Sequence, residues 1–173
     1  MNQPSSKQVR VLAIALTARG FGYSVMESQV MLECGHKEVR GNKNCESISK
    51  IDKLMKQFMP DMVVLQDVNA KGYRRAPRIK ALHRQVVGLA GQHKCKVTQI
   101  SGKKLRQSLL DDEKGTKHEM AEILAKQFPI ELAGKLPPKR RPWENVDGRM
   151  DMFDAVGLVA VFLMGKNFEI QQD

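Results

Sequence analysis

The sequence has few of the residues that build disulfide-bonded or zinc-bound proteins. It contains three cysteines, Cys34, Cys45 and Cys95, without C-x-x-C spacing and without a cluster of histidines nearby. These absences argue against a disulfide framework and a structural zinc site, and they favour a reducing environment. The opening residues MNQPSSK lack the apolar core of a signal peptide, and no apolar run reaches the roughly 18–20 residues of a membrane span. We therefore expect a cytoplasmic protein with no membrane partner.

Acidic residues are absent from one long part of the chain. No Asp or Glu lies between Val68 and Leu110, although this segment holds eleven Lys and Arg residues. The whole chain has a net charge of +10, so this acid-free segment carries the excess. Such charge is either a solvated face or a surface for a polyanion. The length of the segment favours a polyanion, and nucleic-acid phosphates are the commonest one.

Aromatic residues are also scarce. They make up 5% of the chain, and the acid-free segment contains only Tyr73. Contacts to phosphates and to the shape of the nucleic acid therefore fit better than a platform of stacked bases. The single tryptophan, Trp143, lies in a basic, proline-rich loop at 135–149. It could be a wedge beside a site, but a cover over the core is the interpretation we favour.

The hydrophobic pattern predicts one α/β domain. A length of 173 residues with 42% hydrophobic content is enough to bury a core. Early strands joined by tight turns indicate an antiparallel meander, and the later alternation of strands and helices indicates a mixed sheet flanked by helices. We expect a tail at 1–8, a domain at 9–165 and a second tail at 166–173. The expected strands are 9–15, 23–26, 30–39, 62–65 and 96–100, and the expected helices are 44–58, 79–89, 116–128 and 150–164.

Two acidic features point to chemistry. Asp151 and Asp154 lie three residues apart at the start of the last expected helix, so both carboxylates project from one face. They could bind a divalent cation, or they could cap the helix and complement its dipole. Gln66 and Asp67 follow the expected central strand, where α/β proteins often place ligand-binding groups. A simple loop start explains Asp67 equally well.

The order of these parts resembles the RuvC-like Holliday junction resolvases, which have a ribonuclease H-like fold. The resemblance covers the chain from about Val9 to Met164. It implies three antiparallel strands followed by parallel strands, a homodimer, and two-metal phosphodiester hydrolysis with Mg²⁺ or Mn²⁺ held by four carboxylates. The matching segments are VLAIALTARGFGYSV, PDMVVLQDV, KGYRRAPRIKALHRQVVGLA, SGKKLRQSLLDDEKGTKHEMAEIL and DMFDAVGLVAVFL.

The sequence departs from the family at two of the four acidic positions. The first-strand aspartate falls on Ala15, and the central-strand glutamate falls on Gln66, whose neutral amide is a weak ligand for a hard cation. Both changes are ones that an experimenter would choose to trap a substrate. Because Leu16 and Thr17 also differ from the family's Pro-Gly, natural divergence is favoured for the first strand, whereas Gln66 is open to either origin.

The remaining acidic positions match. Asp151 and Asp154 stand where the family has its last two metal ligands. Asp67 could join them only if the strand has ended before it, and His118 could add a ligand or a proton carrier. By the resemblance, Lys117 would be a lysine that contacts DNA.

Three functions follow from these observations. The first is a protein that binds branched or duplex DNA and cleaves it poorly or not at all. The second is an active Mg²⁺- or Mn²⁺-dependent endonuclease that uses Asp67, Asp151, Asp154 and His118. The third is a scaffold whose basic face binds an acidic protein. The candidate phosphate-binding residues are Lys71, Arg74, Arg75, Arg78, Lys80, Arg84, Lys103, Lys104, Lys117, Lys139, Arg140 and Arg141.

Overall fold

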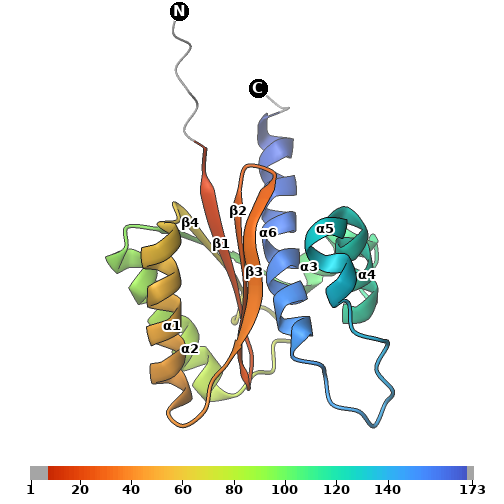
Figure 1. Cartoon of the computed structure of the whole chain (residues 1–173), viewed down its shortest axis with the longest axis horizontal. Coiled ribbons are helices and arrows are strands. Elements are labelled where there is room, and N and C mark those ends of the chain that lie inside the picture. Colours follow the sequence, from red (N-terminus) through yellow and green to blue (C-terminus); the bar gives the residue numbers. More distant parts are fainter. Residues whose placement is uncertain (1–7, 171–173) are drawn as a thin grey trace, which may run out of the picture.

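A mixed five-stranded sheet forms the centre of the molecule (Figure 1). The computed structural model describes residues 8–170, and the side chains of residues 8–165. The strands are β1 (Arg10–Leu16), β2 (Gly20–Glu27), β3 (Val30–Glu38), β4 (Met62–Gln66) and β5 (Lys96–Ile100), in the order β3-β2-β1-β4-β5. The first three strands pair antiparallel, whereas β4 pairs parallel with both β1 and β5. The predicted mixed sheet, with its change from antiparallel to parallel pairing, is confirmed.

Helices cover both faces of this sheet (Figure 1). They are α1 (Lys43–Phe58), α2 (Pro77–Gln92), α3 (Gly102–Leu110), α4 (Lys117–Gln127), α5 (Pro129–Leu132), the 3-10 turn η1 (Ala133–Lys135) and α6 (Arg149–Ile170). Helices α1 and α2 pack on one face, and α6 packs on the other, with α3 and α4 against its outer side. The sheet therefore separates two apolar clusters, one under α1 and α2 and one around α6.

Local sequence explains most of the helix positions. Helix α1 buries Ile51, Leu54 and Met55 on one stripe, as its apolar spacing predicts. Helix α4 begins with a capping box, in which the Thr116 hydroxyl accepts from the Glu119 N–H and the Glu119 carboxylate accepts from the Thr116 N–H. Helix α6 is apolar on all sides from Ala155 to Val161, where the sheet and two helices bury every residue.

Several elements differ from the prediction. The short helices α3 and α5 were not expected, since α3 buries only Leu105 and α5 only Leu132. Helix α6 continues to Ile170, beyond the predicted end at 164 and into the segment predicted as a C-terminal tail. Most of the predicted N-terminal tail, residues 1–7, and residues 171–173 lie outside the described part of the chain. Within the described residues, no helix is long and apolar enough to cross a membrane.

Gly22 allows α6 to approach the sheet closely. A Cβ atom added at Gly22 would overlap the backbone carbonyl of Asp151, in the first turn of α6. The missing side chain therefore lets the start of α6 rest on the backbone of β2. This contact sets the distance between the sheet and the first turn of α6, which carries Asp151.

Substitution of Gly22 by alanine tests this contact. We expect Gly22→Ala to destabilise the fold by about 2 kcal/mol or more, because backbone must move to admit the methyl group. This loss corresponds to a melting temperature about 5 °C lower. The matched control is Gly88→Ala in α2, where an added Cβ meets no neighbour within 4 Å. The control should be as stable as the unmodified protein or slightly more stable, and equal melting temperatures for the two variants would contradict the proposed contact.

Candidate functional site

The carboxyl ends of three parallel strands meet at one edge of the sheet. Ile14 of β1 pairs with Leu65 of β4, so Ala15 and Gln66 follow side by side in the parallel register. The turn between β1 and β2 leaves the sheet at this edge, and the start of α3 directly follows β5 there. Parallel α/β sheets commonly bind ligands outside the carboxyl ends of their strands. We call this region the open end of the sheet.

A small hollow of about 40 Å³ lies at the open end. Ala15, Gln66 and Asp154 line it together with Lys117 and part of α3. Three of the four acidic positions of the resemblance therefore converge in space, although two of them hold no acid. Of the described residues that form its wall, none is Asp67, His118 or Asp151.

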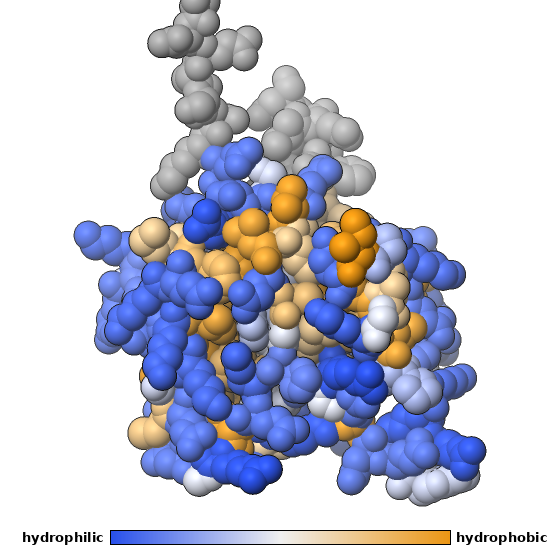
Figure 2. Space-filling model, viewed as in Figure 1, coloured by the Kyte–Doolittle hydropathy of each residue, from blue (hydrophilic) through white to orange (hydrophobic). Residues whose placement is uncertain are grey.

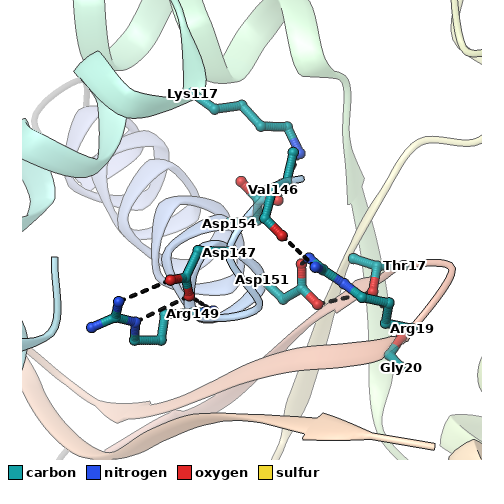
Figure 3. Close-up of polar contacts among 9 residues, drawn as sticks. All are labelled: Thr17, Arg19, Gly20, Lys117, Val146, Asp147, Arg149, Asp151 and Asp154. Carbon is teal, nitrogen blue, oxygen red and sulfur yellow. Dashed lines mark hydrogen bonds and ion pairs between the residues drawn. The ribbon is translucent and has the colours of Figure 1, made fainter. Parts of the chain in front are cut away.

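Lys117 is paired with the one carboxylate in this hollow. Its Nζ atom donates to Oδ2 of Asp154 at 2.9 Å. The capping box at the start of α4 fixes the backbone from which Lys117 extends. An ammonium group of the protein is thus the partner of Asp154, and Figure 3 shows the Lys117 side chain extending from α4 toward α6.

Asp151 is held by the turn between β1 and β2. The side chain is 6% exposed, accepts a hydrogen bond of 2.9 Å from the Thr17 hydroxyl, and lies 3.8 Å from the Arg19 guanidinium (Figure 3). Burial raises the pKa of Asp151 above its ordinary value, although Thr17 and Arg19 oppose this shift. Arg19 also donates to the backbone carbonyl of Val146, so one side chain connects the turn to both α6 and the loop before it.

Asp67 and His118 are engaged outside the hollow. Strand β4 ends at Gln66, and the Asp67 carboxylate then accepts from the Asn69 N–H at 2.9 Å, as at the start of a loop. His118 lies 3.0 Å from Glu122, one turn further along α4. Neither side chain lines the hollow of Ala15, Gln66 and Asp154, and His118 instead lines a second hollow with Lys117, Lys139 and Arg140.

The donors at the open end do not suit a pair of divalent cations. In the part of the chain that the structure describes, no group of three or more His, Cys, Asp and Glu side chains is arranged to hold a metal ion. Ala15 offers no donor and Gln66 offers a neutral amide, whereas Mg²⁺ prefers carboxylate oxygens. The two carboxylates that remain already face Lys117 and Arg19.

The candidate phosphate-binding residues divide into two groups. Arg78 donates to the Ala18 carbonyl and to Asn44, Lys103 pairs with Glu113, Lys117 with Asp154, and Arg140 donates to the Glu144 carbonyl. For the others, no side-chain hydrogen bond or ion pair is present among residues 8–165, apart from the cation–π contact of Arg141 with Trp143. The residues of this second group are Lys71, Arg74, Arg75, Lys80, Arg84, Lys104, Lys139 and Arg141.

Not all of the acid-free segment lies at the open end. Lys94 and Lys96 line a hollow beside Asp61 and Met62, at the opposite edge of the sheet. The loop before α2, which carries Lys71, Arg74 and Arg75, follows β4 directly at the open end. The sequence does not indicate Thr17 and Arg19 as partners of Asp151, because more than 130 positions separate them from it and only the fold brings them together.

The expectation for Trp143 is wrong. This residue is 77% exposed and covers no part of the core. It lies in the loop of residues 136–148, which extends away from the helices before α6 begins (Figure 1). The proline-rich sequence predicted a loop here, and that prediction is confirmed.

The Asp151→Asn variant tests how burial acts on this carboxylate. Because the folded protein binds the Asp151 proton more tightly than the unfolded chain does, stability falls as the pH rises from 3.8 through the raised pKa. An asparagine keeps an acceptor for Thr17 and carries no charge. We expect Asp151→Asn to melt a few degrees higher than the unmodified protein at pH 7, and the difference to shrink as the pH falls toward 3.8. A lower melting temperature at pH 7 would show that attraction to Arg19 outweighs burial.

Comparison with known proteins gives a fold. No family model matches the chain, and no curated protein matches its sequence. Thermus thermophilus RuvC is 15% identical over 91% of this chain and 97% of that chain, with a TM-score of 0.63. The structure of T. thermophilus RuvC in complex with a Holliday junction substrate is 14% identical over 91% and 96%, with a TM-score of 0.67. The yeast mitochondrial Holliday junction resolvase Ydc2 is 13% identical over 90% and 78%, with a TM-score of 0.58. The chain therefore has the ribonuclease H-like fold of RuvC and related Holliday junction resolvases.

Proposed function

We propose that this protein binds branched or duplex DNA at the open end of its sheet and has impaired or absent two-metal nuclease activity. One observation carries the proposal. The hollow that Ala15, Gln66 and Asp154 line contains a single carboxylate, and Lys117 is its partner. A hydrolytic site for two cations needs several unpaired carboxylates in one place.

The charge distribution supports a nucleic-acid partner. The loop after β4, the start of α3 and the loop before α6 all bring basic side chains to the open end. Figure 2, which colours acidic and basic residues alike, shows that hydrophilic residues cover most of the lower part of that face. RuvC, a neighbour in fold, has been solved with a Holliday junction substrate. The shared fold and the basic loops together favour DNA over an acidic protein.

Unpaired and paired basic residues are expected to act differently. Arg74 and Arg75 stand in the loop after β4 without an intramolecular carboxylate among the described residues, so their charges are available to phosphates. Arg78 instead holds the Ala18 carbonyl and Asn44, so it positions the turn that carries Thr17 and Arg19. A homodimer, expected from the resemblance, is part of the proposal because a four-way junction offers two equivalent halves.

Replacement of Arg74 and Arg75 by alanine tests the phosphate contacts. Each lost contact should lower the slope of log affinity against log salt by about one, so the double variant should bind a labelled junction more weakly and with a slope about two units shallower. Fluorescence anisotropy at several salt concentrations measures both quantities.

A control variant removes the same charge elsewhere. Lys53 in α1 and Lys126 near the end of α4 are exposed and lie outside the loops of the open end. Lys53→Ala with Lys126→Ala should leave the slope almost unchanged. Equal slopes for the two double variants would contradict the assigned surface, and no affinity for DNA at low salt would favour the acidic-protein scaffold.

Restoration of the two missing acids tests the impaired site. We expect no cleavage of a labelled four-way junction by the unmodified protein in Mg²⁺ or Mn²⁺, and cleavage by the Ala15→Asp, Gln66→Glu double variant, because three carboxylates would then line the hollow, with Asp151 nearby in the first turn of α6. Denaturing gels over a time course measure the product. Cleavage by the unmodified protein that stops in Asp154→Asn would instead establish the active endonuclease with an altered carboxylate set.

A further inference from the structure

Trp143 is a large aromatic ring that the fold displays to solvent. It is the only tryptophan in the chain, and 77% of it is exposed. A single exposed apolar residue needs no special explanation, so its surroundings decide what it can do. The Arg141 guanidinium lies 5.7 Å from the centre of the ring, at the distance of a cation–π contact.

The turn that bears Trp143 is held in place by its own hydrogen bonds. The Glu144 N–H donates to the Arg141 carbonyl at 3.0 Å, which closes a four-residue turn with Pro142 in its second position. The Glu144 carboxylate accepts from the Arg141 N–H at 2.9 Å, and the Glu144 carbonyl accepts from Arg140 at 2.8 Å. These bonds limit the entropy lost when the ring meets a ligand.

The loop is also attached to the open end of the sheet. Arg19, which faces Asp151, donates to the Val146 carbonyl at the end of this loop (Figure 3). A hollow of about 300 Å³ separates the loop from the start of α4, with Lys117, Lys139 and Arg140 in its wall. The exposed ring therefore belongs to the same basic region as the residues expected to contact phosphates.

Each of the two acidic side chains of the loop has a partner within or beside the loop. Glu144 accepts from the backbone of Arg141, and Asp147 forms an ion pair of 2.8 Å with Arg149. Hydrogen bonds from Arg149 lower the pKa of Asp147 to about 2, which keeps it ionised and paired. Arg141 lies against the ring, and Lys139 stands on the same loop. An anionic ligand with flat, apolar faces matches this combination.

We propose that Trp143 stacks on an unpaired or unstacked nucleobase of bound DNA, while Lys139 and Arg141 contact the neighbouring phosphates. The inference rests on the proposed binding function and specifies which form of DNA the loop selects. Stacking of an aromatic side chain on an exposed base changes affinity by roughly ten-fold or more. The bases inside a blunt duplex already stack on one another, so the ring would have no free face to meet there.

Intrinsic fluorescence tests the proposal, because all tryptophan emission comes from residue 143. The unmodified protein is titrated with a four-way junction, a thymidine 20-mer and a blunt duplex, and anisotropy of labelled DNA measures binding in parallel. We expect the junction and the single strand to quench the emission. The duplex should bind with little change in emission.

Variants measure what the ring contributes. Trp143→Ala should weaken binding of the single strand and the junction about ten-fold and leave duplex binding within about two-fold, whereas Trp143→Phe should retain most of the affinity. Ile130→Ala is the matched control, since Ile130 is an apolar residue, 94% exposed, in α5 outside the loop. This control should leave all three affinities unchanged.

The outcomes separate the two proposals. Binding of the single strand or junction without quenching, or equal losses for all three DNAs in Trp143→Ala, would overturn stacking and leave the proposed DNA binding intact. The absence of binding to any of the three DNAs at low salt would overturn both the stacking and the DNA binding. It would favour a protein as the partner of the exposed ring and the neighbouring arginines.

Discussion

The contact between the start of α6 and the backbone of β2 determines the geometry of the open end. Because Gly22 has no side chain, α6 can rest on β2 at this point. Asp151 then lies buried against the turn that follows β1. A carboxylate in that position needs polar partners: the Thr17 hydroxyl donates a hydrogen bond to it, and the Arg19 guanidinium forms an ion pair with it at 3.8 Å. The next acidic residue on the same helix, Asp154, faces Lys117 of α4. Both acids therefore connect α6 to neighbouring elements.

The open end has the positions that the resemblance assigns to a nuclease site, but its two carboxylates are paired with Arg19 and Lys117. Ala15, Gln66 and Asp154 line one hollow, but the side chains present give one carboxylate where the resemblance implies several. The positive charges that face Asp151 and Asp154 are the side chains of Arg19 and Lys117. This combination is the basis of our proposal that the open end binds phosphates and lacks metal-dependent hydrolysis.

The sequence predicted the fold well where periodicity and capping are strong. The alternation of strands and helices, the stripe of α1 and the capping box at Thr116 all follow from local patterns. Helix α3 was missed because Leu105 is its single buried residue. Thr17 and Arg19 were missed as partners of Asp151 because tertiary packing alone joins them. Trp143 was misjudged because a lone tryptophan in a loop has no periodicity that would indicate its exposure.

Binding of Mn²⁺ to the unmodified protein tests the central claim most directly. Electron paramagnetic resonance detects free Mn²⁺, so a titration shows whether the protein removes the ion from solution. If Lys117 and Arg19 already balance the two carboxylates, Mn²⁺ remains free in the millimolar range, and the same result holds in Asp154→Asn. A saturable site in the unmodified protein that disappears in Asp154→Asn would contradict the account.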